Sequence, residues 1–151
     1  MYMRIIISFI IYFFFIFPLQ AVFAEEFLML KNNKVNVRHG PSFEYPIKYV
    51  YLKKNLPIKV IDKKENFRRI IDHKQNSGWI HTSQLKKSSS VILIKDQFIF
   101  TKPSKFSKPL AIAKKGKLIL LEKCRKNWCK IKSKDISGWI LFENFWGKLL
   151  N

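Results

Sequence analysis

The tetrapeptide Ser77-Gly78-Trp79-Ile80 occurs again as Ser137-Gly138-Trp139-Ile140, sixty positions further along the chain. The chain has only four tryptophans and five glycines, so this repeat uses an unusual share of both. Other residues recur in the same order at spacings of sixty to sixty-three: Leu85 with Phe145, Phe67 with Trp128, Ile70 with Ile131, Leu56 with Leu118, Phe43 with Phe106 and Pro46 with Pro109. Turns that differ in length by single residues would produce this slippage, so the sequence predicts a tandem duplication.

Within each copy the apolar residues recur with the period of strands. Apolar and polar residues alternate over 35–38 and again over 56–60, and the second copy behaves alike at 118–121, 128–131 and 138–141. No segment after residue 24 keeps a helical apolar period, although 82–85 and 142–145 could form single 3₁₀ turns. About five short strands in sixty residues predict an all-β fold of two small closed or half-closed β-barrels. Units of this size have small cores, so we expect the copies to pack against each other.

The junction between the copies is predicted at the Lys-Lys-Ser-Ser-Ser stretch 86–90, which divides the chain into domains 25–88 and 89–151. The apolar run 91–94 is interpreted as the opening strand of the second copy, although it could equally close the first.

The first 24 residues have the layout of a secretory signal peptide. Arg4 precedes a run of thirteen residues, 5–17, that is apolar except for Ser8, and small residues precede a predicted cleavage after Ala24. The alternative is an uncleaved membrane anchor, but the run is shorter than the roughly 18 residues of a spanning helix. The sequence therefore predicts export to the periplasm or beyond.

Residues 25–151 carry 28 lysines and arginines against 10 acidic residues, a formal charge of +18. Such a charge favours polyanions: anionic lipid heads, acidic polysaccharides, wall polymers or nucleic acid. Export argues against nucleic acid, and membrane contact after signal cleavage is expected to be peripheral at most. The alternative is compositional bias, since the chain is rich in Lys, Ile, Asn and Phe together.

Catalytic motifs are missing from the sequence. The three histidines are isolated, and no nucleophile motif, phosphate loop or paired-acid motif occurs. We therefore expect no enzyme, no catalytic residue, no metal site and no cofactor.

Cys124 and Cys129 flank four residues that are typical of a hairpin turn. In an oxidising compartment a structural disulfide across this turn is the expected state, because two thiols without a nearby histidine do not make a zinc site.

Strand parity places an aromatic residue beside a cation in each copy. Trp128 shares a face with Lys130, and also with Lys132 and Lys134, while Phe67 shares a face with Arg69. An amphipathic ring beside positive charge suits a sugar or a peptide with carboxylates. The alternative is that the lysine stems merely cover the ring. Trp79 and Trp139 are expected in the core or between the copies, with ligand stacking as the alternative.

The stretch Val35-Asn36-Val37-Arg38-His39-Gly40-Pro41-Ser42, followed by Gly78-Trp79-Ile80, resembles the signature of bacterial SH3-type domains. The tandem form, with Cys124, Cys129 and a Trp146-Gly147 ending, is similar to an exported two-domain group. The resemblance is weaker in the second copy, where the stretch 101–104 lacks the Arg and the Gly.

The resemblance implies two SH3-like domains that bind rather than catalyse, with cell-wall peptidoglycan as the expected ligand. Asn36 and Arg38 then join Phe67, Arg69, Trp128 and Lys130 as candidate ligand-binding residues. The alternative for the first stretch is structural: Gly40-Pro41 forms a turn, with Gly40 at positive φ, and Arg38 pairs with an acid such as Glu44.

The sequence thus predicts an exported binding module for peptidoglycan or another anionic wall polymer. The alternative is an adaptor that recruits or positions an envelope enzyme, and a third possibility is salt-sensitive adhesion to anionic lipid.

Overall fold

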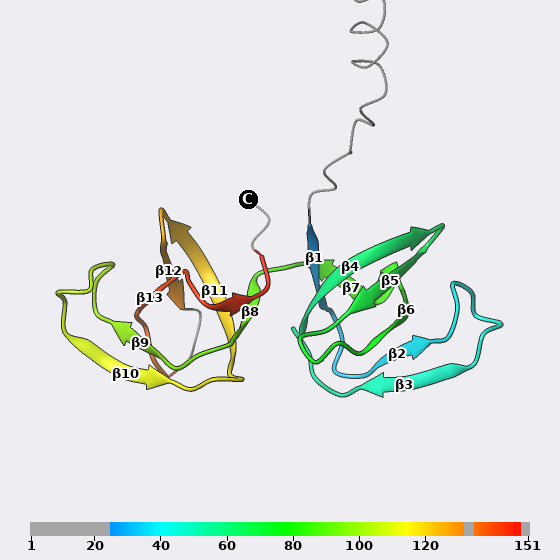
Figure 1. Cartoon of the computed structure of the whole chain (residues 1–151), viewed down its shortest axis with the longest axis horizontal. Helices are drawn as coiled ribbons and strands as arrows, with labels where there is room; N and C mark the ends of the chain where they lie inside the picture. Colours follow the sequence, from blue (N-terminus) through cyan, green and yellow to red (C-terminus); the bar gives the residue numbers. More distant parts are fainter. Residues whose placement is uncertain (1–24, 132–134, 149–151) are drawn as a thin grey trace, which may run out of the picture.

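A computed structural model describes residues 25–131 and 135–148 (Figure 1). The predicted signal peptide 1–24 lies outside these residues, as do Lys132 and Lys134. Across the two described ranges, no helix is long and apolar enough to cross a membrane.

The first copy is one antiparallel sheet of seven strands. Its strand order is β3-β2-β6-β5-β4-β1-β7. The strands are β1 Glu26–Leu30, β2 Val35–Arg38, β3 Ile47–Tyr51, β4 Pro57–Lys64, β5 Phe67–Ile71, β6 Ser77–His81 and β7 Leu85–Lys87. A single 3₁₀ turn, η1 Thr82–Gln84, precedes β7, as the sequence predicted.

The second copy repeats this topology strand for strand. Its order, β10-β9-β13-β12-β11-β8-β14, is the first order with seven added to each number. The strands are β8 Ser90–Leu93, β9 Gln97–Phe100, β10 Pro109–Ala113, β11 Leu118–Arg125, β12 Trp128–Ile131, β13 Trp139–Leu141 and β14 Phe145–Trp146. The all-β class and the duplication are confirmed, and Figure 1 shows the two coiled sheets next to each other along the long axis.

The sheets are not closed barrels, so the closed form of that prediction is wrong. The strand order of the first sheet ends at β3 and β7, which do not pair. A side chain of β3 contacts the turn after β5 instead: the Tyr51 hydroxyl donates to the Asp72 carboxylate over 3.0 Å. That carboxylate also accepts the backbone N–H groups of Lys74 and Asn76, at 2.8 and 2.9 Å, and thereby fixes the turn.

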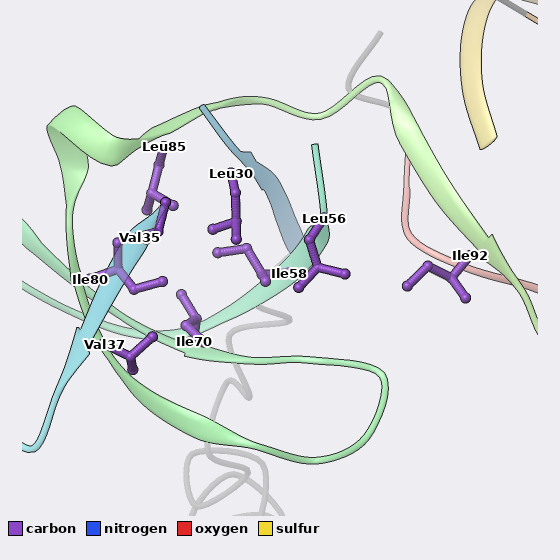
Figure 2. Close-up of a cluster of buried hydrophobic side chains, with 9 residues drawn as sticks. All are labelled: Leu30, Val35, Val37, Leu56, Ile58, Ile70, Ile80, Leu85 and Ile92. Atoms are coloured by element: carbon purple, nitrogen blue, oxygen red, sulfur yellow. The ribbon is translucent and has the colours of Figure 1, made fainter. Parts of the chain in front are cut away.

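The inner face of each sheet holds a compact aliphatic core. Figure 2 shows the first: Leu30, Val35, Val37, Leu56, Ile58, Ile70, Ile80 and Leu85, with Ile92 approaching from a strand of the second copy. The second core consists of Val91, Leu93, Ile99, Ala113, Ile119, Leu121, Cys129, Ile131 and Ile140. The alternation predicted for 35–38 and for 128–131 is confirmed, since every second residue is buried.

The predicted hairpin around the cysteines is confirmed. Cys124 on β11 lies opposite Cys129 on β12, and the two form a disulfide. Cys129 is fully buried, so the disulfide lies at the edge of the second core.

A row of three side chains from the second copy packs against the first core, and we call this row the seam. Leu118, Ile92 and Trp146 are register neighbours on β11, β8 and β14. All three pack with the first core cluster, and the Trp146 ring meets Phe27 of β1 edge-on at 5.5 Å. The expected packing between the copies is therefore present.

The run 91–94 opens the second sheet, as interpreted, because β8 pairs with β11 and β14. The 3₁₀ turn expected at 142–145 is wrong. Phe145 already begins β14 and pairs with Leu93, so the backbone there must be extended, and Asn144 turns the chain with a φ of 55°.

Ile92→Ala is expected to destabilise the first copy, although Ile92 belongs to the second. Its side chain is 1% exposed, and the truncation of a buried isoleucine costs about 2–5 kcal/mol. The matched control is Ile112→Ala on β10, where the side chain is 50% exposed and a cost below about 0.5 kcal/mol is expected. Urea unfolding gives the free energies, and hydrogen exchange at the amides of Leu30 and Ile58 locates the loss. Equal costs for both variants would contradict the seam.

Asp72→Asn is expected to destabilise the protein at neutral pH but much less in acid. Burial of the Asp72 carboxyl tends to raise its pKa, but hydrogen bonds from Asn76, Lys74 and Tyr51 outweigh burial and hold the pKa below its ordinary value. A lowered pKa in the folded state contributes stability that is present above the unfolded pKa of about 3.9 and is lost as the pH falls through the folded value. Urea unfolding from about pH 7 to about pH 2.5 should show the gap between wild type and variant closing below about pH 4. Exposed Asp62→Asn is the control, and a pH-independent gap would contradict the role of the charge.

Candidate functional site

The outer face of the first sheet carries most of the predicted site. Along β2, Val35 and Val37 point into the core, so Asn36 and Arg38 lie on the opposite face. Along β5 and β6 the buried Ile70 and Ile80 likewise leave the alternate residues outside.

Register places a tryptophan between two arginines on this face. Trp79 of β6 pairs with Arg38 of β2 on one side and with Arg69 of β5 on the other. The three side chains therefore form a row across adjacent strands, and we call it the Arg–Trp–Arg row. The Arg69 side chain is exposed, and within the part of the chain that is described it makes no ion pair and no side-chain hydrogen bond.

The expectation that Trp79 and Trp139 lie in the core or between the copies is wrong. Both are half-buried, and neither belongs to a core cluster. The physical reason is the glycine before each of them. A Cβ at Gly78 would collide with Val37 of β2, so Gly78 holds the inward position where the strands come close, and Trp79 must point outward.

Arg38 anchors the loop 39–46 that joins β2 to β3. Its guanidinium donates to the carbonyl oxygens of Phe43, at 3.1 Å, and Tyr45, at 2.7 Å. It also lies 5.3 Å from the centroid of the Phe43 ring. The structural alternative for Arg38 is thus partly correct, but the acceptors are backbone carbonyls and not Glu44.

Gly40 is not at positive φ, so that expectation is also wrong. Glycine is required here because the Tyr45 ring packs closely against the backbone: a Cβ at Gly40 would lie 2.5 Å from that ring. Gly40 lets the loop fold back over Tyr45 and bring Phe43 to the sheet.

An aromatic cluster borders the Arg–Trp–Arg row. Phe43 meets Phe67 edge-on at 5.2 Å, and both rings lie 5.1 Å from His81. Within this cluster Phe67 is buried, whereas Phe43 is 61% exposed. Phe67 was predicted as a site residue, whereas Phe43 was missed: only its match with Phe106 in the repeat marked it.

Asn36 lies on the same face of β2, beside the end of η1. Its backbone N–H donates to the Gln84 side chain over 3.3 Å. Arg38, Phe67 and Arg69 are therefore brought together with Trp79, and Asn36 lies further along the same strand.

The second sheet has a related outer face with different chemistry. Trp139 of β13 pairs with Phe100 of β9 and with Lys130 of β12, so Phe100 occupies the place of Arg38. Trp128 meets Phe100 edge-on at 5.6 Å. The predicted cation Lys130 is in an ion pair with Glu122 at 3.3 Å. Trp128 and Lys130 do share this face, as strand parity predicted, but the lysine already has a carboxylate partner.

A shallow pocket of about 290 Å³ opens beside this second face. Phe98, Phe100 and Leu141 give it an apolar side, and Lys95, Asp96 and Lys105 give it a charged side. Neither outer face contains a group of three His, Cys, Asp or Glu side chains that could hold a metal ion, nor does any other described part of the chain.

Comparison with known proteins gives one family. The family model of the bacterial SH3 domain matches twice, at residues 31–87 and 95–147. A search of the curated proteins finds no match.

Among solved structures the chain is similar to NlpC2 of Trichomonas vaginalis, at 13% identity over 83% of this chain and 49% of that one, with a TM-score of 0.37. It is also similar to NlpC1 of the same organism, at 12% identity over 85% and 48%, with a TM-score of 0.38. A third structure is an NlpC/P60 family protein of Bacillus cereus, at 12% identity over 80% and 55%, with a TM-score of 0.38. The chain spans about half the length of these proteins.

The two family matches cover most of the chain, and each spans six of the seven strands of one sheet, β2 to β7 and β9 to β14. The protein therefore belongs to the bacterial SH3 domain family, of which it carries two copies in tandem.

Proposed function

We propose that this protein is an exported, non-catalytic binding module that recognises a peptidoglycan component of the cell wall on the outer face of its first copy. The observation that carries the proposal is the Arg–Trp–Arg row, in which Trp79 lies between Arg38 and Arg69 on the face away from the core. Its family supports a binding role, and the Cys124–Cys129 disulfide is compatible with an oxidising compartment such as the periplasm.

The chemistry of the row suits this ligand. Peptidoglycan combines sugar rings, whose faces are apolar, with stem peptides that carry carboxylates. An indole ring offers a flat apolar surface for a sugar, and a guanidinium binds a carboxylate through two parallel hydrogen bonds. Tryptophan and arginine on adjacent strands place both functions within reach of one ligand.

The two arginines are assigned different roles. Arg38 already donates to the carbonyls of Phe43 and Tyr45, so it positions the loop and the exposed Phe43 ring. Arg69 is exposed and without such partners, so it is the arginine that meets the ligand carboxylate.

The first copy is the principal reader of the ligand. In the second copy the place of Arg38 is taken by Phe100, and Lys130 is paired with Glu122. A ligand carboxylate would have to displace Glu122 there, whereas Arg69 requires no such exchange.

Arg69→Gln is expected to weaken binding to purified sacculi about tenfold, the cost of a lost hydrogen bond between charged groups. The matched control is Arg125→Gln, which removes an exposed arginine from the hairpin of the second copy and is expected to change affinity less than twofold. Co-sedimentation of residues 25–151 with sacculi, repeated over a salt series, measures both.

Trp79→Leu should reduce the same binding without a change in net charge, and Lys130→Gln should leave it nearly unchanged. Thermal unfolding of each variant establishes that it remains folded. Equal losses for Arg69→Gln and Arg125→Gln, both abolished by salt, would reduce the binding to net charge and contradict the site. A wild-type protein that does not sediment with sacculi would overturn the proposal and favour the adaptor of an envelope enzyme.

A further inference from the structure

The corresponding loop aromatics, Phe43 and Phe106, are packed differently in the two copies. In the first copy Phe43 rests against Phe67 and His81 beneath the Arg38 guanidinium. Its counterpart in the repeat, Phe106, lies in the loop 101–108 between β9 and β10 and is fully exposed, at 102%. Singly exposed apolar residues are common on protein surfaces, so Phe106 is informative only together with the charged and apolar residues that adjoin it.

Two residues that bring the first loop onto its sheet, Arg38 and Gly40, have no counterpart in the second copy. Phe100 pairs with Trp139 where Arg38 pairs with Trp79. Phenylalanine has no donors for the loop carbonyls, so nothing comparable draws the 101–108 loop back onto the sheet.

The loop nevertheless has a defined conformation. The Ser107 hydroxyl donates to the carbonyl oxygens of Ser104, at 2.8 Å, and Lys102, at 3.0 Å. The backbone N–H of Thr101 donates to the Lys108 carbonyl over 3.0 Å at the base of the loop. These hydrogen bonds hold the loop in a conformation in which Phe106 points into solvent.

Positive charge surrounds the exposed ring. Lys102, Lys105 and Lys108 all lie in this loop and are exposed, and the stretch 97–121 contains six lysines and no acidic residue. An open depression of about 380 Å³ lies at the loop, and the residues that line it are Thr101, Lys102, Ser104, Phe106, Ser107 and Lys108. Two lysines and the hydroxyls of Thr101 and Ser104 beside one ring suit a phosphate that carries an apolar chain.

Further apolar surface adjoins the loop on the edge hairpin. Phe98 of β9 is 52% exposed and pairs with Ile112 of β10, which is 50% exposed. Leu110 of the same edge strand is 45% exposed.

We propose that the 101–108 loop and its edge hairpin form a docking site for an anionic lipid membrane. Phe106 enters the interface between headgroups and acyl chains, and the three lysines bind lipid phosphates while their stems lie along the apolar surface. Each lysine near an anionic membrane surface strengthens binding about fivefold, so three lysines and one aromatic give reversible binding.

A membrane fits these features better than a protein or the wall. The loop projects at one end of the molecule, whereas the corresponding 39–46 loop lies at the opposite end (Figure 1). A projecting aromatic among cations needs a partner that is anionic at its surface and apolar just below it, which is the arrangement of a lipid bilayer. Docking by this end leaves the Arg–Trp–Arg row of the other copy free.

Vesicle co-sedimentation tests the site with residues 25–151, which contain both sheets. Phosphatidylglycerol–phosphatidylcholine vesicles are compared with pure phosphatidylcholine vesicles. The wild type should bind the anionic vesicles only, and Phe106→Ser should weaken that binding about tenfold. Leu52→Ser is the matched control, because Leu52 is 78% exposed in the first copy beside Lys53 and Lys54, and it should bind like the wild type.

Two triple variants distinguish an effect of net charge from an effect of where the lysines lie. Lys102, Lys105 and Lys108 are changed to glutamine in one, and the exposed Lys31, Lys34 and Lys64 of the first copy are changed in the other. Both lose the same net charge, but the loop variant should lose at least about tenfold more affinity. Equal losses would show that only net charge matters and would overturn the loop as a site.

Insertion of the loop into the membrane is measured by the fluorescence of a dye attached to it. Phe106→Cys, labelled with an environment-sensitive fluorophore, should shift its emission to the blue on anionic vesicles, while labelled Leu52→Cys should not. No shift, or no binding of the wild type to any vesicle, overturns the proposal and leaves a protein partner for this surface. Phe106→Ser should bind sacculi as the wild type does, so failure here is independent of the wall-binding function.

Discussion

Strand β8 is buried on both of its faces, and the arrangement of the two copies depends on it. Val91 and Leu93 belong to the second core, whereas Ile92 between them belongs to the first. Its neighbours follow the same alternation: Ile119 and Phe145 face the second core, and Leu118 and Trp146 face the first. These three paired strands belong to the second sheet, and their opposite face covers the core of the first. Because the two cores share this layer, we expect the two domains to unfold cooperatively and not independently.

The shared layer also explains why the sequence left the run 91–94 ambiguous. A strand with one buried face alternates between apolar and polar residues, but a strand buried on both faces is apolar throughout, and so gives no sign of the core to which it belongs. Strands with a solvent face, such as β2 and β12, were predicted with their correct inward residues. The duplication, the all-β class and the cysteine hairpin were predictable for the same reason, because they depend on local period and spacing. That the sheets are open could not be predicted, because closure of a barrel depends on whether the two edge strands pair.

The candidate site was predictable only in part. Strand parity placed Phe67 beside Arg69 and Trp128 beside Lys130, but parity concerns one strand and says nothing of its neighbours. The central position of Trp79 between two arginines depends on the register of three strands that are far apart in the chain. The glycine of the repeated tetrapeptide is the local signal that could have revealed it. Gly78 and Gly138 both lie where a Cβ would collide with an inward aliphatic residue, Val37 or Ile99, so the next residue must point outward.

The divergence of the two copies follows from that shared geometry. The outward tryptophan is present in both, but its β2 or β9 neighbour is arginine in one and phenylalanine in the other. Arginine supplies donors that draw a loop onto the sheet, and so produces a face in which an aromatic cluster adjoins a free cation. Phenylalanine meets Trp128 edge-on instead, and the adjoining loop keeps its aromatic and its lysines in solvent. The absence of this arginine, together with the missing counterpart of Gly40, accompanies the change from a loop packed on the sheet to a loop whose aromatic lies in solvent. Since the two loops lie at opposite ends of the molecule (Figure 1), ligands of the two surfaces would not compete.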